Sequence, residues 1–168
     1  RAPLAVHADE TTWPILDRHA HDGYMWIISN QAGAYYRFEP TRSGRIAQEL
    51  FKDYNGTVLT DGYSGYNRLK RAKIKVAHCW AHARRKFVDI ENLYEQEVTE
   101  IIEKMGRLFA VEHEAKDFNE LRMLRKEKSA LIADEIRVWL IEKKEKHLPE
   151  SVFTKAVNYT LKHWDGLT

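Results

Sequence analysis

Hydrophobic periodicity changes along this chain, and that change constrains the fold more than any other feature. In the first half, apolar residues come in short β-branched and aromatic runs, of which residues 23–29 and 34–38 are the clearest. Runs of this kind are typical of β-strands. After His82 the apolar residues recur three or four positions apart, as on one face of a helix. We therefore predict a mixed α/β segment, residues 1–90, followed by an all-helical segment, residues 91–168.

The α/β segment has a predicted element order of βββαβαβ. A first strand at residues 6–9 runs on towards residues 13–16, and short turns join it to the next two strands, which indicates an antiparallel meander. The remaining elements are a helix at 46–51, a strand at 57–60, a short helix at 63–69 and a strand at 73–77. In this order the first and fourth strands can lie side by side. The helical segment is predicted to end in a helix over residues 151–164.

Length and composition exclude several classes of protein. The 168 residues include a single cysteine, Cys79, so a disulfide within the chain is impossible and a reducing compartment is favoured. No apolar run approaches the ~18 residues of a transmembrane helix. Because the chain starts with Arg1 and not with methionine, we expect a fragment of a longer protein.

Positive charge is concentrated in one part of the chain. Residues 1–90 carry 14 Lys and Arg against 9 Asp and Glu, whereas residues 91–168 carry 13 against 16. A stretch without any acid holds eight basic residues: Arg68, Lys70, Arg71, Lys73, Lys75, Arg84, Arg85 and Lys86. Such a stretch attracts polyanions such as DNA, although a solvated basic surface is an equally ordinary explanation.

Two aspartates are candidate metal ligands. Asp9 is predicted at the end of the first strand and Asp61 at the end of the fourth, so their carboxylates would face one another. Paired carboxylates repel unless a cation joins them, and Mg²⁺ or Mn²⁺ suits oxygen ligands. The alternatives are a plain turn at Asp61-Gly62 and a cap or solvated acid at Asp9.

Cys79 and His82 form a second unusual element. On a helix, residues three apart share a face. A structural zinc would need about four ligands, so His78 or a distant histidine would have to join them. One alternative is a helix start beside an active centre, with His82 positioning a phosphate or an aspartate. The other is that Cys79 and Trp80 are core residues and the two histidines, His78 and His82, are incidental.

Four motifs taken together resemble the DDE transposases of the insertion-sequence-66 family. They are HADET at 7–11, SNQAG at 29–33, VLTDGYSGY at 58–66 and HCWAHARRKF at 78–87. The resemblance covers essentially the whole chain. It implies a ribonuclease-H-like fold with a helical insertion, Mg²⁺ or Mn²⁺ in a two-metal site, and DNA strand cleavage and transfer. It further implies a bacterial cytoplasmic protein, transposon ends and target DNA as partners, and a homo-oligomer or accessory transposition proteins.

The resemblance also implies roles for individual residues. Asp9 matches the first catalytic acid and metal ligand, and Asp61 the second. Cys79 and His82 match a Cys-x-x-His signature thought to be structural or DNA-positioning. The third acid of the family lies in an Asn-x-x-Glu-Arg motif after the insertion. Residues 92–95 fit Asn-x-x-Glu, but Gln96 follows in place of arginine and the match precedes the insertion, so we treat it as chance.

Without the third acid, we expect the chain alone to be inactive. Without the last core helix that carries this acid, we expect the sheet to expose an apolar face. Three other functions stay open at this point. One is a non-catalytic fragment that binds DNA or the transposase. Another is a different ribonuclease-H-like nuclease. The last is a zinc or metal-sensing protein built on Cys79 and His82.

Overall fold

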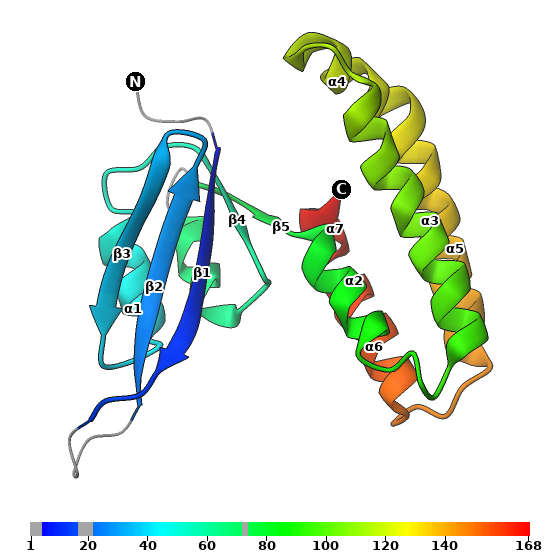
Figure 1. Ribbon diagram of the computed structural model, residues 1–168, viewed down its shortest axis with the longest axis horizontal. Coiled ribbons are helices and arrows are strands. Elements are labelled where there is room, and N and C mark those ends of the chain that lie inside the picture. Colours follow the sequence, from blue (N-terminus) through cyan, green and yellow to red (C-terminus); the bar gives the residue numbers. More distant parts are fainter. Residues whose placement is uncertain (1–4, 17–21, 72–73) are drawn as a thin grey trace. The chain divides into compact units, whose positions relative to one another are not determined.

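The computed structural model describes residues 5–16, 22–71 and 74–168. These residues belong to two compact units, Arg1–Cys79 and Trp80–Thr168. The first unit contains a sheet and the second is helical (Figure 1). Each unit has its own hydrophobic core and is described by itself.

Five strands form one mixed sheet in the first unit. They are β1 (Ala5–Trp13), β2 (Gly23–Asn30), β3 (Gly33–Glu39), β4 (Thr57–Thr60) and β5 (Lys75–His78). Their order is β3-β2-β1-β4-β5, with antiparallel β1–β2 and β2–β3 pairs and parallel β1–β4 and β4–β5 pairs. The mixed α/β class, the antiparallel meander and the adjacency of the first and fourth strands are therefore confirmed.

The first strand differs from the prediction at its far end. β1 runs without a break from Ala5 to Trp13, and residues 14–16 are irregular. Pro14 has no N–H to donate to a neighbouring strand, which explains why the strand stops there. Asp9 consequently lies inside β1 and not at its end, so that part of the prediction was wrong.

One face of the sheet is covered by two helices. The first, α1 (Gly44–Leu50), follows the N-cap Ser43, whose Oγ accepts a hydrogen bond from the Arg45 N–H. The other is η1 (Ser64–Arg71), a 3₁₀ helix where we predicted a short helix. Both lie on the same side of β1 and β2 (Figure 1) and share a core with them. The fully buried members of this core include Trp26, Val58, Tyr66 and Leu69.

The opposite face of the sheet carries exposed aromatic side chains. Tyr36 is 62% exposed and Phe38 is 45% exposed, as expected for a sheet with an apolar face open to solvent. The pairing places Tyr36 beside Ile27, and Ile27 beside Asp9. Since residues paired in a sheet share a face, Asp9 lies on this open face.

The helical unit contains α2 (Trp80–Val88), α3 (Glu95–Glu114), α4 (Phe118–Leu124), a short π-helical segment η2 (Arg125–Ser129), α5 (Ala130–Glu145), α6 (Val152–Lys162) and α7 (Trp164–Leu167). Figure 1 shows the long helices α3 and α5 side by side. The core between the helices includes fully buried Phe87, Ile101, Met105, Ile136 and Phe153. The predicted final helix at 151–164 is present as α6, with Ser151 as its N-cap.

Helix α2 packs into the helical core through Ala83 and Phe87, and Ile90, just after the helix, joins the same core. The compact units therefore divide at Cys79. The division of a catalytic core from an insertion at residue 90 concerns the family's domain plan, and it stays a prediction.

Candidate functional site

The two candidate aspartates lie in or just after two strands that pair, β1 and β4. The parallel pairing joins Ala5 to Thr57, Val6 to Val58 and His7 to Leu59. Asp9 and Asp61 each lie two residues beyond the last pair of this ladder, Asp9 within β1 and Asp61 just after the end of β4. Asp9 is exposed and the Asp61 side chain is 24% exposed, which leaves both carboxylates within reach of solvent.

A tight turn fixes Asp61 at the end of β4. The Asp61 Oδ1 accepts a hydrogen bond of 2.7 Å from the Tyr63 N–H, and the Thr60 Oγ1 accepts one of 3.2 Å from the Gly62 N–H. Gly62 has a φ of 88°, a left-handed conformation that glycine adopts without steric cost. The turn interpretation of Asp61-Gly62 is thus correct locally, and the same turn holds the Asp61 carboxylate in a defined place.

A buried charge network adjoins the aspartates, and sequence reasoning missed it. The Glu10 side chain is 0% exposed, accepts a hydrogen bond from the Arg42 Nε at 2.5 Å and accepts another from the Tyr66 hydroxyl at 2.6 Å. The Arg42 Nη2 in turn lies 3.6 Å from the Asp61 Oδ2. The arginine is also stacked, with its Cζ 3.9 Å from the centre of the Tyr63 ring. The alternation of side chains along a strand could have revealed that Glu10 is buried, because it puts residue 10 on the same face as the apolar residues 6 and 8.

The network sets the protonation of its members. Burial raises the pKa of Glu10, while the hydrogen bonds from Tyr66 and Arg42 oppose that rise. Burial and the Glu10 charge raise the pKa of Tyr66 strongly. The Tyr66 hydroxyl therefore stays protonated and donates a hydrogen bond to Glu10. Partial burial disfavours the Arg42 cation, but the hydrogen bond that Arg42 donates to Glu10 and the charges of Glu10 and Asp61 leave the pKa of Arg42 raised. Arg42 therefore stays charged beside Asp61.

The donor set at Asp9 and Asp61 suits a hard divalent cation, since it consists of carboxylate oxygens. It is a partial set. Across residues 5–16, 22–71 and 74–168, no group of three or more His, Cys, Asp or Glu side chains could hold a metal ion. The role of Asp9 and Asp61 as metal ligands therefore stays a prediction.

Cys79 and His82 lie at the start of α2. Cys79 is half-buried, and its N–H donates a hydrogen bond of 3.0 Å to the Thr60 carbonyl, just before Asp61. His82 lies in the first turn of α2 and is also half-buried. Neither residue belongs to a potential three-ligand cluster in the part of the chain that the structure describes. The zinc interpretation therefore gains no support from the geometry.

The predicted DNA-binding residues fall into two groups, one in each unit. In the first unit, Arg68 and Lys75 are exposed, and Lys70 and Arg71 lie at the end of η1. Lys73 lies outside the described residues. In the helical unit, three successive exposed residues of α2 form the second group: Arg84, Arg85 and Lys86.

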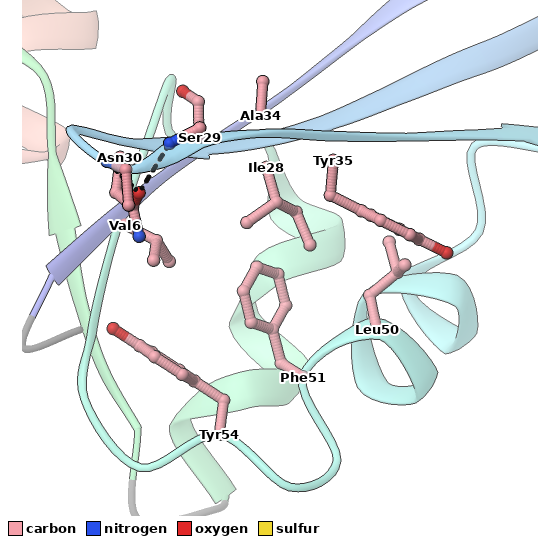
Figure 2. A pocket seen from close by; sticks show the side chains of 11 residues that line it. Val6, Ile28, Ser29, Asn30, Ala34, Tyr35, Leu50, Phe51 and Tyr54 are labelled. Atoms are coloured by element: carbon pink, nitrogen blue, oxygen red, sulfur yellow. Dashed lines mark hydrogen bonds between the residues drawn. The ribbon is translucent and has the colours of Figure 1, made fainter. Parts of the chain in front are cut away.

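The sheet unit also has an apolar depression, distinct from the aspartates. It has a volume of about 440 Å³ and lies between the β2–β3 turn and the end of α1. Figure 2 shows Ile28 and Tyr35 on one side and Phe51 and Tyr54 on the other. None of the predicted catalytic, metal-binding or DNA-binding residues lines it.

Comparison with known proteins gives a family match. The sequence model described as "Transposase IS66 family" matches residues 2–168. Two proteins of Sinorhizobium fredii, named uncharacterized protein y4jD and uncharacterized protein y4qI, are 32% and 31% identical to this chain over 99% and 96% of its length. The chain spans only 37% and 34% of their lengths. No solved structure matches. Among the described residues, no helix is long and apolar enough to cross a membrane.

Proposed function

Because the chain belongs to the IS66 family of transposases, we propose that it forms part of a catalytic domain that cleaves DNA at transposon ends and joins the freed 3′ hydroxyl to target DNA. The observation that supports the proposal is the parallel pairing of β1, which contains Asp9, with β4, which ends just before Asp61. The strand order β3-β2-β1-β4-β5 supports a ribonuclease-H-like fold for the domain.

Asp9 and Asp61 would hold Mg²⁺ or Mn²⁺ through their carboxylate oxygens. A pair of such ions about 3.5–4 Å apart activates the attacking oxygen and stabilises the leaving oxygen of a phosphodiester. The chain's own residues would supply the position of the acids: β1 carries Asp9 next to β4, and the turn at Gly62 holds the Asp61 carboxylate through the Tyr63 N–H. Because the family's third acid is not identified in this chain, we expect residues 1–168 alone to show little or no strand transfer.

The decisive experiment is carried out on the full reading frame that encodes this chain. Asp9→Asn and Asp61→Asn should each abolish Mg²⁺-dependent cleavage of a transposon-end duplex, because each removes a charged metal ligand. Asp53→Asn is the matched control, since the Asp53 side chain is 88% exposed and Asp53 is not one of the proposed metal ligands. Cleavage that persists in both asparagine variants would rule out the proposed roles of Asp9 and Asp61.

A second candidate function is DNA binding without catalysis. It is favoured by the partial donor set, since the described residues offer no third metal ligand. If about four of the basic residues contact phosphates, log K for DNA should fall with log salt with a slope near −3.6. Binding by the chain should then survive the combined Asp9→Asn and Asp61→Asn change. The basic residues concerned are Arg68, Lys70, Arg71, Lys73, Lys75, Arg84, Arg85 and Lys86.

A further inference from the structure

Glu10 and Arg42 form an ion pair that the two-acid site does not explain. The Glu10 carboxylate is fully buried, and burying a charge is costly unless it is paired and hydrogen-bonded. Replacing a buried ion pair by apolar residues is often neutral or stabilising, so the pair is weak evidence of a stabilising role. The ion pair is therefore better explained by the group that it holds in place.

The pair holds the Arg42 guanidinium beside Asp61. The Nε is bonded to Glu10, the Tyr66 hydroxyl fixes the other Glu10 oxygen, and the guanidinium lies over the Tyr63 ring. These partners come from β1, η1 and the β4–η1 turn, so three segments of the chain constrain one side chain. The Nη2 is left pointing to the Asp61 Oδ2 at 3.6 Å.

The Arg42 side chain is nevertheless 37% exposed. A guanidinium has five N–H donors in a planar fork that matches the oxygens of a phosphate. Glu10 uses the Nε–H, which leaves donors at the exposed edge for a second anion. The fixed position of the group lowers the entropy cost of such binding.

We propose that Arg42 is a built-in counter-cation of Asp61, anchored by Glu10 and Tyr66, which competes with a divalent cation for Asp61 until a DNA phosphate engages the guanidinium. Arg42 is thus a positioning residue that couples metal binding to DNA binding. The inference rests on the proposed role of Asp61 as a metal ligand and adds the group that regulates it.

The first test measures Mn²⁺ affinity of the full protein that contains this chain by water-proton relaxation, without DNA. Loss of the Arg42 cation should tighten binding several-fold even though the Glu10 charge is removed with it, because Asp61 faces the Nη2 of the guanidinium and Glu10 binds its Nε. The informative variant is the double change Glu10→Gln and Arg42→Gln, because it removes the cation without leaving a buried carboxylate unpaired. Arg42→Lys keeps the charge and should leave the affinity within about twofold of the parent chain.

Two controls separate the possible failures. Arg45→Gln removes a neighbouring arginine whose side chain is 79% exposed and should leave Mn²⁺ affinity unchanged. Asp61→Asn should abolish the tight Mn²⁺ site. If Asp61→Asn has no effect, the proposed metal site itself is wrong. If Asp61→Asn abolishes binding but the double variant binds Mn²⁺ no more tightly than the parent chain, only the counter-cation role is overturned.

The second test repeats the titration with a short DNA duplex at saturating concentration. DNA should tighten Mn²⁺ binding several-fold in the parent chain and much less in the double variant, since binding coupled through one group is lost with that group. The Asp61→Asn chain with the same duplex corrects for Mn²⁺ bound by the DNA alone. Equal coupling in the parent chain and the double variant would overturn the phosphate step. A circular dichroism melt of every variant confirms that it is folded.

Discussion

Asp9 and Glu10 are neighbours in the chain but lie on opposite faces of the sheet. Asp9 is exposed beside Ile27 on the open face, whereas Glu10 is buried beside Trp26. The period of two along a strand explains the difference. One dipeptide therefore supplies a solvent-accessible carboxylate for the proposed metal and a buried carboxylate for the Arg42 anchor.

Tyr66→Phe tests the buried anchor. The change removes the hydroxyl that donates to Glu10 at 2.6 Å but keeps the ring, which packs edge-on against Trp26. Since a buried acceptor loses its partner, the free energy of unfolding should fall by about 1–3 kcal/mol in a urea titration. Tyr36→Phe is the matched control, because the Tyr36 side chain is 62% exposed. Equal losses in the two variants would show that the hydrogen bond contributes nothing.

At this scale the sequence predicts the acids better than it predicts their partners. Asp9 and Asp61 stand out because each belongs to a short motif in a strand. Arg42 could not be linked to Glu10, since 31 residues separate the two in the chain. Contacts of that kind depend on how the β3–α1 loop folds back over the sheet, and no local pattern records it.

Single capping residues set where the helices begin. The Ser151 Oγ accepts a hydrogen bond of 3.1 Å from the Thr154 N–H at the start of α6. Ser151→Ala should lower the free energy of unfolding by about 0.5–2 kcal/mol, because that N–H loses its acceptor. The matched control is Ser129→Ala: the Ser129 Oγ is buried and has no hydrogen-bond partner among the described residues, so its loss should be neutral or stabilising. Chemical denaturation of both variants decides the matter, and a larger loss for Ser129→Ala would contradict it.

Glu100 joins α3 to α5, which gives the helical unit a pH dependence. Hydrogen bonds from Lys143 and Trp139 lower the pKa of Glu100 below its ordinary value of 4.5. A lowered pKa stabilises the folded state above the ordinary value, and this contribution is lost as the pH falls through the folded-state pKa. Glu100→Gln should therefore make unfolding less pH-dependent below about pH 4.5, as measured by urea titrations at several pH values. Glu103→Gln, an exposed acid on the same helix, should retain the parent dependence.

The elements themselves were largely predictable, and their ends were less so. β-Branched and aromatic runs identified β2 and β3, and the start of the last helix was predicted at Ser151. Strand β1 was predicted too short, because the polar residues Glu10, Thr11 and Thr12 hide a strand that its pairing with β2 maintains. The same limitation put Asp9 at a strand end.

Two separate cores make up the whole molecule, so unfolding should not be a single event. Phe87 is fully buried in the helical core, and Val58 is fully buried in the sheet core. Phe87→Ala should lower the stability of the helical unit by about 3–5 kcal/mol and leave the sheet unit nearly unchanged.

Hydrogen exchange resolves this prediction, since amides of Ile101 and Trp26 report on the two units separately. Val58→Ala is the reciprocal control and should accelerate exchange at Trp26 only. Equal acceleration at both amides in either variant would show that the units unfold together. The change of periodicity in the sequence predicted a two-part chain, but it could not show that α2 packs with the helices, because Phe87 and Ile90 fit either core.

The short parallel ladder between β1 and β4 has a consequence for how this protein can change in evolution. Substitutions along β1 leave the register of its pairing with β4 unchanged, so their effects can be tested one position at a time. Deletion of one residue between His7 and Asp9 would instead exchange the sides of the two acids, turning Glu10 outward and Asp9 into the core. Length variation should therefore be tolerated in the loops and the long helices. An insertion or deletion between Val6 and Glu10 should not be tolerated, because it would change the strand register.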